Sequence, residues 1–128
     1  MRCLIVDDSA AFVDAASRLL ERDGITVVGV ASNGAEALLR FEELRPDVTL
    51  VDINLGGESG FDVVDQLHRA GASVASPVIL ISTHAWQDFA DMVATSRAVG
   101  FLSKSAFSAE AIRDLVRGSA SFEVGDHC

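Results

Sequence analysis

The sequence contains no tyrosine, two prolines and a single lysine, and no run approaches the roughly 20 apolar residues that a transmembrane helix needs. Its first apolar run is also too short for a secretory signal peptide. Basic residues are scarce: 10 Lys and Arg against 19 Asp and Glu give a net charge of −9, which argues against non-specific binding to nucleic acid or to an anionic membrane. Two cysteines, Cys3 in an apolar run and Cys128 at the end, indicate reduced thiols rather than a disulfide framework. We therefore expect a cytoplasmic protein without membrane insertion.

Short apolar runs alternate with segments of helical periodicity as far as about Gly118. Nearly half of the residues are apolar, which is typical of one globular domain with a sizeable core. The predicted strands are residues 3–6, 25–30, 48–52, 77–81 and 99–102, and the least regular of the predicted helices covers residues 85–97. The alternation predicts an α/β fold, a doubly wound parallel sheet of five strands in the order 2-1-3-4-5. The domain is expected to span residues 1–118, followed by a loose tail at residues 119–128.

Polar residues follow four of the predicted strands. The first strand ends in Asp7 and Asp8, the third in Asp52, the fourth in Ser82 and the fifth in Lys104. Because parallel strands end at one edge of the sheet, and the strand order reverses between the first and third, the acids should converge there. Crowded carboxylates repel one another unless a cation is present, and Mg²⁺ suits such ligands. Lysine and serine can bind phosphoryl oxygens, so the pattern indicates phosphoryl transfer to an aspartate nucleophile.

Each of these residues has an ordinary interpretation when it is taken alone. An Asp pair after a strand can cap a helix, Asp52 can start a turn, and a lone lysine commonly lies at the surface. The histidines His68 and His84 have no second histidine or cysteine at ligand spacing. The functional interpretation rests on the coincidence of four strand ends.

The strand-end motifs together resemble the receiver domain of two-component response regulators, from about residue 2 to residue 118. The matching segments are Leu4-Ile5-Val6-Asp7-Asp8-Ser9, Val51-Asp52-Ile53-Asn54-Leu55, Pro77-Val78-Ile79-Leu80-Ile81-Ser82 and Gly100-Phe101-Leu102-Ser103-Lys104. Each motif is weak alone, but their combination in this order is specific.

The resemblance implies that Asp52 is phosphorylated by a histidine kinase or a phosphotransfer protein. It also implies a Mg²⁺ ion held by Asp7, Asp8 and Asp52, with Asp8 as the more direct of the first two ligands. The backbone carbonyl of Asn54 would be a further ligand. The chain would then be a signalling domain that catalyses only its own phosphorylation and dephosphorylation.

The same resemblance implies a conformational switch. Lys104 would pair with the phosphoryl group, Ser82 would swing toward it, and Phe101 would change rotamer in the vacated space. That movement would remodel the face formed by the fourth helix, fifth strand and fifth helix, which would bind a downstream protein or a second copy of the chain. Apolar residues Trp86, Phe89 and Met92 of the irregular helix are candidates for this surface.

The sequence departs from the family pattern at three positions. Ser105 stands where many receivers carry a proline in a cis bond, so the loop holding Lys104 is expected to be looser. Gly56 replaces a common proline, and Phe101 lacks the hydroxyl of a tyrosine. None of these changes removes a residue that takes part in the expected phosphoryl chemistry, but they make the geometry of the conformational switch less predictable.

The local sequences around Gly34 and Lys104 resemble receivers of LuxR/NarL-type regulators, which usually carry a C-terminal DNA-binding helix-turn-helix. No such segment follows Gly118, so direct nucleic-acid binding by this chain is not expected. We favour a stand-alone receiver over the alternative, a receiver fragment of a longer transcriptional regulator. An Asp-nucleophile phosphatase is a distant alternative, because Asn54 occupies the position where such enzymes have a general acid. A pseudo-receiver that binds partners without phosphorylation is disfavoured by the complete set of acids, Ser82 and Lys104.

Overall fold

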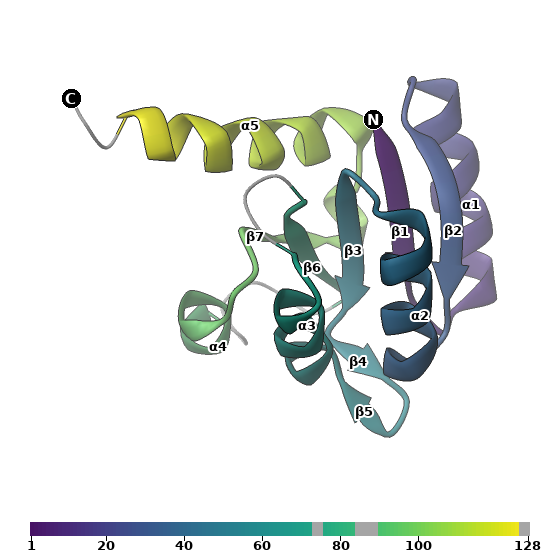
Figure 1. The fold of residues 1–128 in the computed structure, drawn as a ribbon. Helices are drawn as coiled ribbons and strands as arrows, with labels where there is room; N and C mark the ends of the chain where they lie inside the picture. The colour runs from purple at the N-terminus through teal and green to yellow at the C-terminus, as the bar shows by residue number, and fades with distance from the viewer. Residues whose placement is uncertain (73–75, 84–89, 126–128) are drawn as a thin grey trace.

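The centre of the molecule is a parallel sheet of five strands (Figure 1). The computed structural model describes residues 1–72, 76–83 and 90–125, with side chains up to residue 118. The strand order is β2-β1-β3-β6-β7, which confirms the predicted order 2-1-3-4-5 and the doubly wound α/β fold. The five strands are β1 (Arg2–Val6), β2 (Thr26–Ala31), β3 (Val48–Asp52), β6 (Val78–Ser82) and β7 (Gly100–Ser103).

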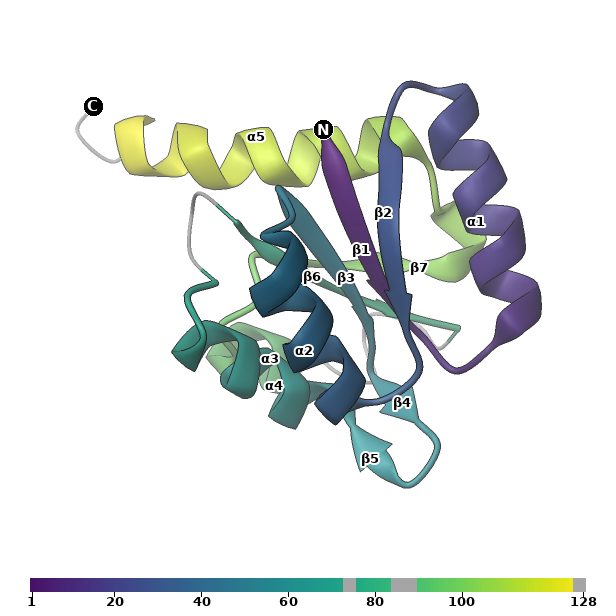
Figure 2. The same cartoon turned by 45° about the vertical axis from the view of Figure 1, so that its right-hand side comes forward.

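Helices cover both faces of this sheet and divide the core in two. Alternate residues of each strand point to opposite faces, so Leu4 and Val6 pack with α2, α3 and α4, while Cys3 and Ile5 pack with α1 and α5. Figure 2 shows α2 and α3 in front of the strands and α5 behind them. The described helices are α1 (Ala10–Arg22), α2 (Gly34–Leu44), α3 (Gly60–Arg69), α4 (Ala90–Thr95) and α5 (Ala109–Gly125).

Side-chain caps begin four of these helices. Ser9 accepts a hydrogen bond from the backbone N–H of Phe12, and Asn33 accepts one from that of Glu36. Ser59 and Ser108 cap α3 and α5 in the same way. Each cap satisfies a backbone donor that the helix cannot, which fixes where the chain turns from strand end into helix.

Two short elements beside the sheet edge were not predicted. A small hairpin, β4 (Asn54–Leu55) and β5 (Glu58–Ser59), follows β3 and lies beyond the arrowheads of the central strands in Figure 1. Its turn contains Gly56 with φ 68°, a left-handed conformation that glycine adopts without strain. A single 3₁₀ turn, η2 (Lys104–Ala106), follows β7.

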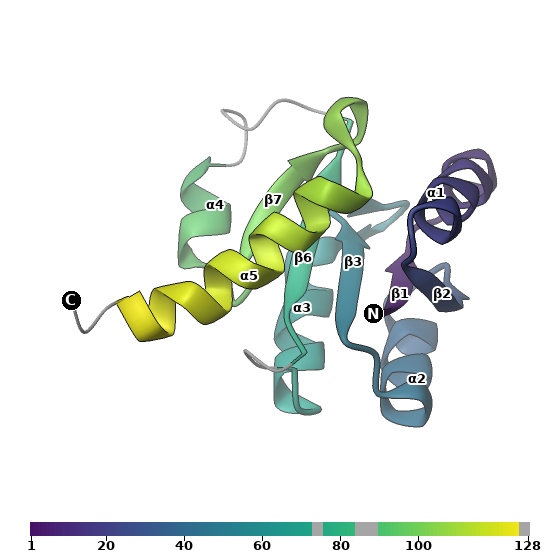
Figure 3. The same ribbon diagram turned by 90° about the horizontal axis from the view of Figure 1, so that it is seen from above.

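The predicted loose tail is wrong over most of its length, because α5 continues through Gly125. Gly118 indicates a helix end in the sequence, but a single glycine costs a helix only about 1 kcal/mol relative to alanine, and no proline follows it. Figures 1 and 3 show this end of α5 extending beyond the sheet. Of the irregular helix predicted at 85–97, the structure describes Ala90–Thr95 as helical, while residues 84–89 lie outside the described part. Among the described helices, none combines the length and apolar character that crossing a bilayer requires.

Candidate functional site

The end of β1 delivers two acids to the sheet edge. The backbone N–H of Asp7 donates to the carbonyl of Ala31 at 2.9 Å, so the ladder with β2 continues through this residue. Its Oδ1 accepts the backbone N–H of Ser9 at 2.8 Å, which turns the chain toward α1. Asp7 is buried at 2% exposure, whereas Asp8 is exposed. One acid is thus fixed inside the site and the other faces solvent at its mouth.

The end of β3 delivers the third acid, Asp52, which is 7% exposed. Its Oδ1 accepts the backbone N–H of Asn54 at 3.1 Å. Gly60 packs directly behind this residue, and a side chain at position 60 would collide with the Asp52 carbonyl oxygen. The backbone N–H of Gly60 also donates to the carbonyl of Ile53 at 2.7 Å. The start of α3 therefore holds the end of β3 from behind and leaves the carboxylate facing the edge.

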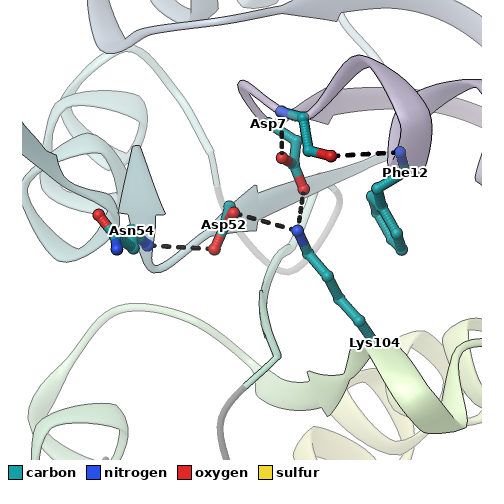
Figure 4. A network of polar contacts seen from close by, with 6 residues as sticks. Asp7, Phe12, Asp52, Asn54 and Lys104 are labelled. Carbon is teal, nitrogen blue, oxygen red and sulfur yellow. Dashed lines mark hydrogen bonds and ion pairs between the residues drawn. The ribbon is translucent and has the colours of Figure 1, made fainter. Parts of the chain in front are cut away.

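Lys104, which directly follows the edge strand β7, forms ion pairs with both buried acids (Figure 4). Its Nζ lies 2.7 Å from Oδ2 of Asp7 and 3.2 Å from Oδ2 of Asp52. Only 11% of its side chain is exposed, so water screens these pairs weakly. Residues from β1, β3 and the turn after β7 therefore meet at one point, as predicted from the strand ends.

Burial and charge shift the protonation equilibria at this point. Burial, with the nearby charge of Asp7, raises the pKa of Asp52, although the Asn54 N–H and Lys104 act in the opposite direction. Burial by itself would lower the pKa of Lys104, but its contacts with Asp7 and Asp52 outweigh it and raise that pKa. The ammonium therefore stays charged at neutral pH, beside a carboxylate whose charge is disfavoured by its surroundings.

The three acids also form a possible cation site. Asp7, Asp8 and Asp52 each offer a carboxylate oxygen, and these oxygens lie within 4.8 Å of one another. Two are buried and one is exposed, which leaves an approach from solvent. Hard oxygen donors in this number suit Mg²⁺, which keeps some of its waters. The donor set thus fits the ion expected from the sequence.

The remaining predicted residues lie at or near the same edge. Ser82 is buried at the end of β6 and pairs in register with Ser103 at the end of β7. Asn54 begins β4, one residue after the end of β3. Phe101 is half-buried in β7 and packs against the core on the α2–α3 side. His84 lies outside the described residues, and His68 is exposed at the far end of α3.

Sequence reasoning missed two contacts at this site. Glu58 Oε1 accepts the backbone N–H of Gly34 at 2.7 Å and so ties the loop after β3 to the first turn of α2. The ring of Phe12 lies with its centroid 4.3 Å from Lys104 Nζ, a contact that the helical periodicity around Phe12 does not predict. A signal existed for the second contact, because Phe12 sits one turn after Asp8 and must therefore lie near the sheet edge.

Comparison with known proteins supports the same arrangement. The family model described as "Response regulator receiver domain" matches residues 3–117. This chain is a member of that family. The match covers every residue of the site, and it leaves out residues 1–2 and 118–128.

Relatives of the receiver domain include longer regulatory proteins. This chain is 33% identical to the transcriptional regulatory protein YvfU of Bacillus subtilis (strain 168), in an alignment that covers 95% of this chain and 62% of YvfU. It is 31% identical to the response regulator GacA of Pseudomonas viridiflava, covering 88% of this chain and 52% of GacA. The chain therefore spans between half and two thirds of the length of these two relatives.

A solved structure shares both the fold and part of the sequence. The signal receiver domain of the response regulator NarL from Mycobacterium tuberculosis superposes with a TM-score of 0.80 at 30% identity, covering 91% of this chain and 96% of that one. Receiver domains act in two-component signalling, where they interact with histidine kinases and downstream effectors. The receiver described here is therefore a signalling domain of the response regulator class.

Proposed function

We propose that this receiver accepts a phosphoryl group on Asp52 from a histidine kinase or a phosphotransfer protein. The observation that carries this proposal is the position of the Asp52 carboxylate, which lies at the strand-order reversal between two further acids and the Lys104 ammonium. A nucleophilic carboxylate needs a nearby positive charge to tolerate the incoming anionic phosphoryl group. The site supplies that charge from the only lysine in the sequence.

The ion in this proposal is Mg²⁺, bound by Asp7, Asp8 and Asp52 together with the backbone carbonyl of Asn54. When bound, Mg²⁺ would offset the negative charge that builds up as the acids and the phosphoryl oxygens approach one another. The exposure of Asp8 beside two buried acids supports it as the ligand that the ion meets first.

In the transfer itself, a carboxylate oxygen of Asp52 attacks the phosphorus atom of a phosphohistidine. A new P–O bond forms while the P–N bond breaks, and the departing imidazole nitrogen keeps the electron pair and takes up a proton from solvent. Lys104 neutralises one phosphoryl oxygen, and the Ser82 hydroxyl donates a hydrogen bond to another. Asp52 thereby becomes an acyl phosphate.

The output surface in this proposal is the face of α4, β7 and α5. Met92 of α4 is 50% exposed, and Phe101 of β7 is half-buried. Phosphorylation would shift Ser82 and Phe101 and so change this face, which would bind a partner protein or a second copy of the receiver. Trp86 and Phe89, the other residues predicted for this surface, lie outside the described residues.

The test is the intact mass of the protein after incubation with acetyl phosphate and Mg²⁺. We expect one added phosphoryl group on the wild type, and none on Asp52→Asn or in the presence of EDTA. Phosphoramidate, which carries a P–N bond, serves as a second donor. A wild type that remains unmodified with both donors, or an Asp52→Asn variant that is still modified, would contradict the proposal. Continuous hydrolysis of a phosphomonoester that depends on Asp52 would support a phosphatase instead.

A further inference from the structure

Lys104 enters the site from a weakly buried part of the sheet. It follows β7, an edge strand in which only Leu102 is buried, and it begins the 3₁₀ turn η2. The backbone there is held by Ser103, whose hydroxyl accepts the N–H of Ser105 at 3.3 Å and lies 2.8 Å from the Ser105 hydroxyl. These contacts fix the turn but do not reach the long lysine side chain. Its ammonium must be directed by what surrounds it.

The third neighbour of the ammonium, after the two acids, is the face of Phe12. The ring centroid lies 4.3 Å from Nζ, well within the distance at which a cation is attracted to an aromatic face (Figure 4). Phe12 belongs to the first turn of α1, whose start is fixed by the Ser9 cap. The ring therefore comes from the helix that begins shortly after Asp7, and Figure 4 shows it on the other side of Lys104 Nζ from Asp52.

A second ring supports the first. Phe107, which follows η2, packs edge-to-face against Phe12 with centroids 5.2 Å apart and an interplanar angle of 77°. This is a favoured geometry for aromatic pairs. Lys104, the first residue of η2, and Phe107, the residue directly after it, therefore both contact Phe12. The pair connects the turn after β7 to the start of α1 on the face where α1 and α5 cover the sheet.

We propose that Phe12 is a positioning residue for phosphoryl transfer, whose ring holds the Lys104 ammonium beside Asp52. The inference rests on the proposed function of Asp52. A flexible four-carbon side chain loses rotamer entropy when it is held in one place. The two carboxylates lie 2.7 and 3.2 Å from the ammonium, and the ring adds a third attractive contact that limits its movement and covers one side of it.

Three variants separate this role from simple packing. Phe12→Leu keeps an apolar side chain but removes the aromatic face, whereas Phe12→Tyr keeps the face. Phe107→Leu removes the supporting ring and leaves the Phe12 face in place. We expect phosphorylation by acetyl phosphate to slow roughly 5- to 30-fold in Phe12→Leu, the range of a buried cation–π contact, and to stay within about 2-fold of the wild type in Phe12→Tyr. Phe107→Leu should lie between them.

The structural readout uses the single lysine of the chain. Protein labelled with ¹³C-lysine gives one set of Hε–Cε NMR signals, and these report Lys104 alone. In the wild type, the ring current of Phe12 should shift the Hε signals upfield. Phe12→Leu should lose this shift, and Phe12→Tyr should keep it. Urea midpoints of the variants provide the control for general loss of stability.

Two results would overturn the proposal. The first is a Phe12→Leu variant whose Hε signals match those of the wild type, which would show that the ring does not face the ammonium. The second is loss of the shift with an unchanged phosphorylation rate, which would reduce Phe12 to packing. A wild type that shows the ring-current shift but accepts no phosphoryl group would refute the function of Asp52 and the role of Phe12 with it, while a normal wild type paired with an equally fast Phe12→Leu would refute the role of Phe12 alone.

Discussion

Asp52 and Lys104 meet in one ion pair but come from strands of different kinds. All five residues of β3 are buried, and the strand lies in the middle of the sheet between β1 and β6. β7 is an edge strand with one buried residue of four. The position of the anionic half of the site is therefore set by sheet register and core packing. The position of the cationic half depends on side-chain contacts that reach across from α1, and this difference identifies which changes should affect the chemistry without affecting the fold.

The largest effect should follow from removal of the cation. In Lys104→Met, Asp52 loses the ammonium at 3.2 Å that would stabilise the transferring phosphoryl group. We expect the rate of phosphorylation by acetyl phosphate to fall about 100-fold or more, as when other electrostatic stabilisers are removed from active sites. Arg117→Met, which removes an exposed positive charge on α5, is the matched control and should react at the wild-type rate. Equal rates for the two variants would break the assignment of Lys104.

The contrast in burial predicts a contrast in stability. Leu50 of β3 is fully buried and Leu102 of β7 is 7% exposed, and both belong to the core under α1 and α5. We expect Leu50→Ala to lower the free energy of unfolding by about 4 kcal/mol and Leu102→Ala by about 2 kcal/mol, since the edge strand can relax around the cavity. Urea denaturation at pH 7 measures both. A larger loss at Leu102 would reverse the proposed order of the two strands.

Burial within the central strands should also make the free energy of unfolding depend on pH. Burial raises the pKa of Cys3, in β1, from 9.0 to about 12. Above pH 9 the unfolded thiol loses its proton while the folded one keeps it, so the stability present below pH 9 is lost as the pH rises toward 12. The free energy of unfolding should fall by about 1.4 kcal/mol per pH unit more than in Cys3→Ala. Urea denaturation of both proteins between pH 8 and 10.5 gives this difference, and parallel slopes would contradict it.

The smallest effect concerns the loop that follows β3. Glu58 accepts the N–H of Gly34, and in Glu58→Ala that donor at the start of α2 loses its partner. We expect a loss of about 1 kcal/mol in the free energy of unfolding, with Glu42→Ala on the exposed side of α2 as the control. Amide hydrogen exchange at Gly34 should accelerate in Glu58→Ala only. Unchanged exchange at Gly34 would show that the link does not hold the loop.

The two halves of the site also differ in how far the sequence predicts them. Asp7, Asp8 and Asp52 were placed correctly because a parallel sheet fixes where its strands end, and apolar runs mark those strands clearly. The arrival of Lys104 at the same edge followed from the same rule. The ring of Phe12 against its ammonium did not, because helical periodicity assigns Phe12 to a buried face without saying which neighbour it meets.

Local backbone features were predicted unevenly for similar reasons. Caps such as Asn33 and Ser108 are predictable from sequence because their bonds join residues three apart. The link from Glu58 to Gly34 spans 24 residues and exists only in the folded chain. The end of α5 was misplaced because Gly118 is a weak helix breaker.

The most direct test of the account is to locate the phosphorylated residue itself. Borohydride reduces an aspartyl phosphate to homoserine, so peptide mass spectrometry after phosphorylation and reduction identifies the modified position. We expect homoserine at position 52 and unchanged aspartate at positions 7 and 8. Homoserine at position 7 or 8, with position 52 unchanged, would contradict it.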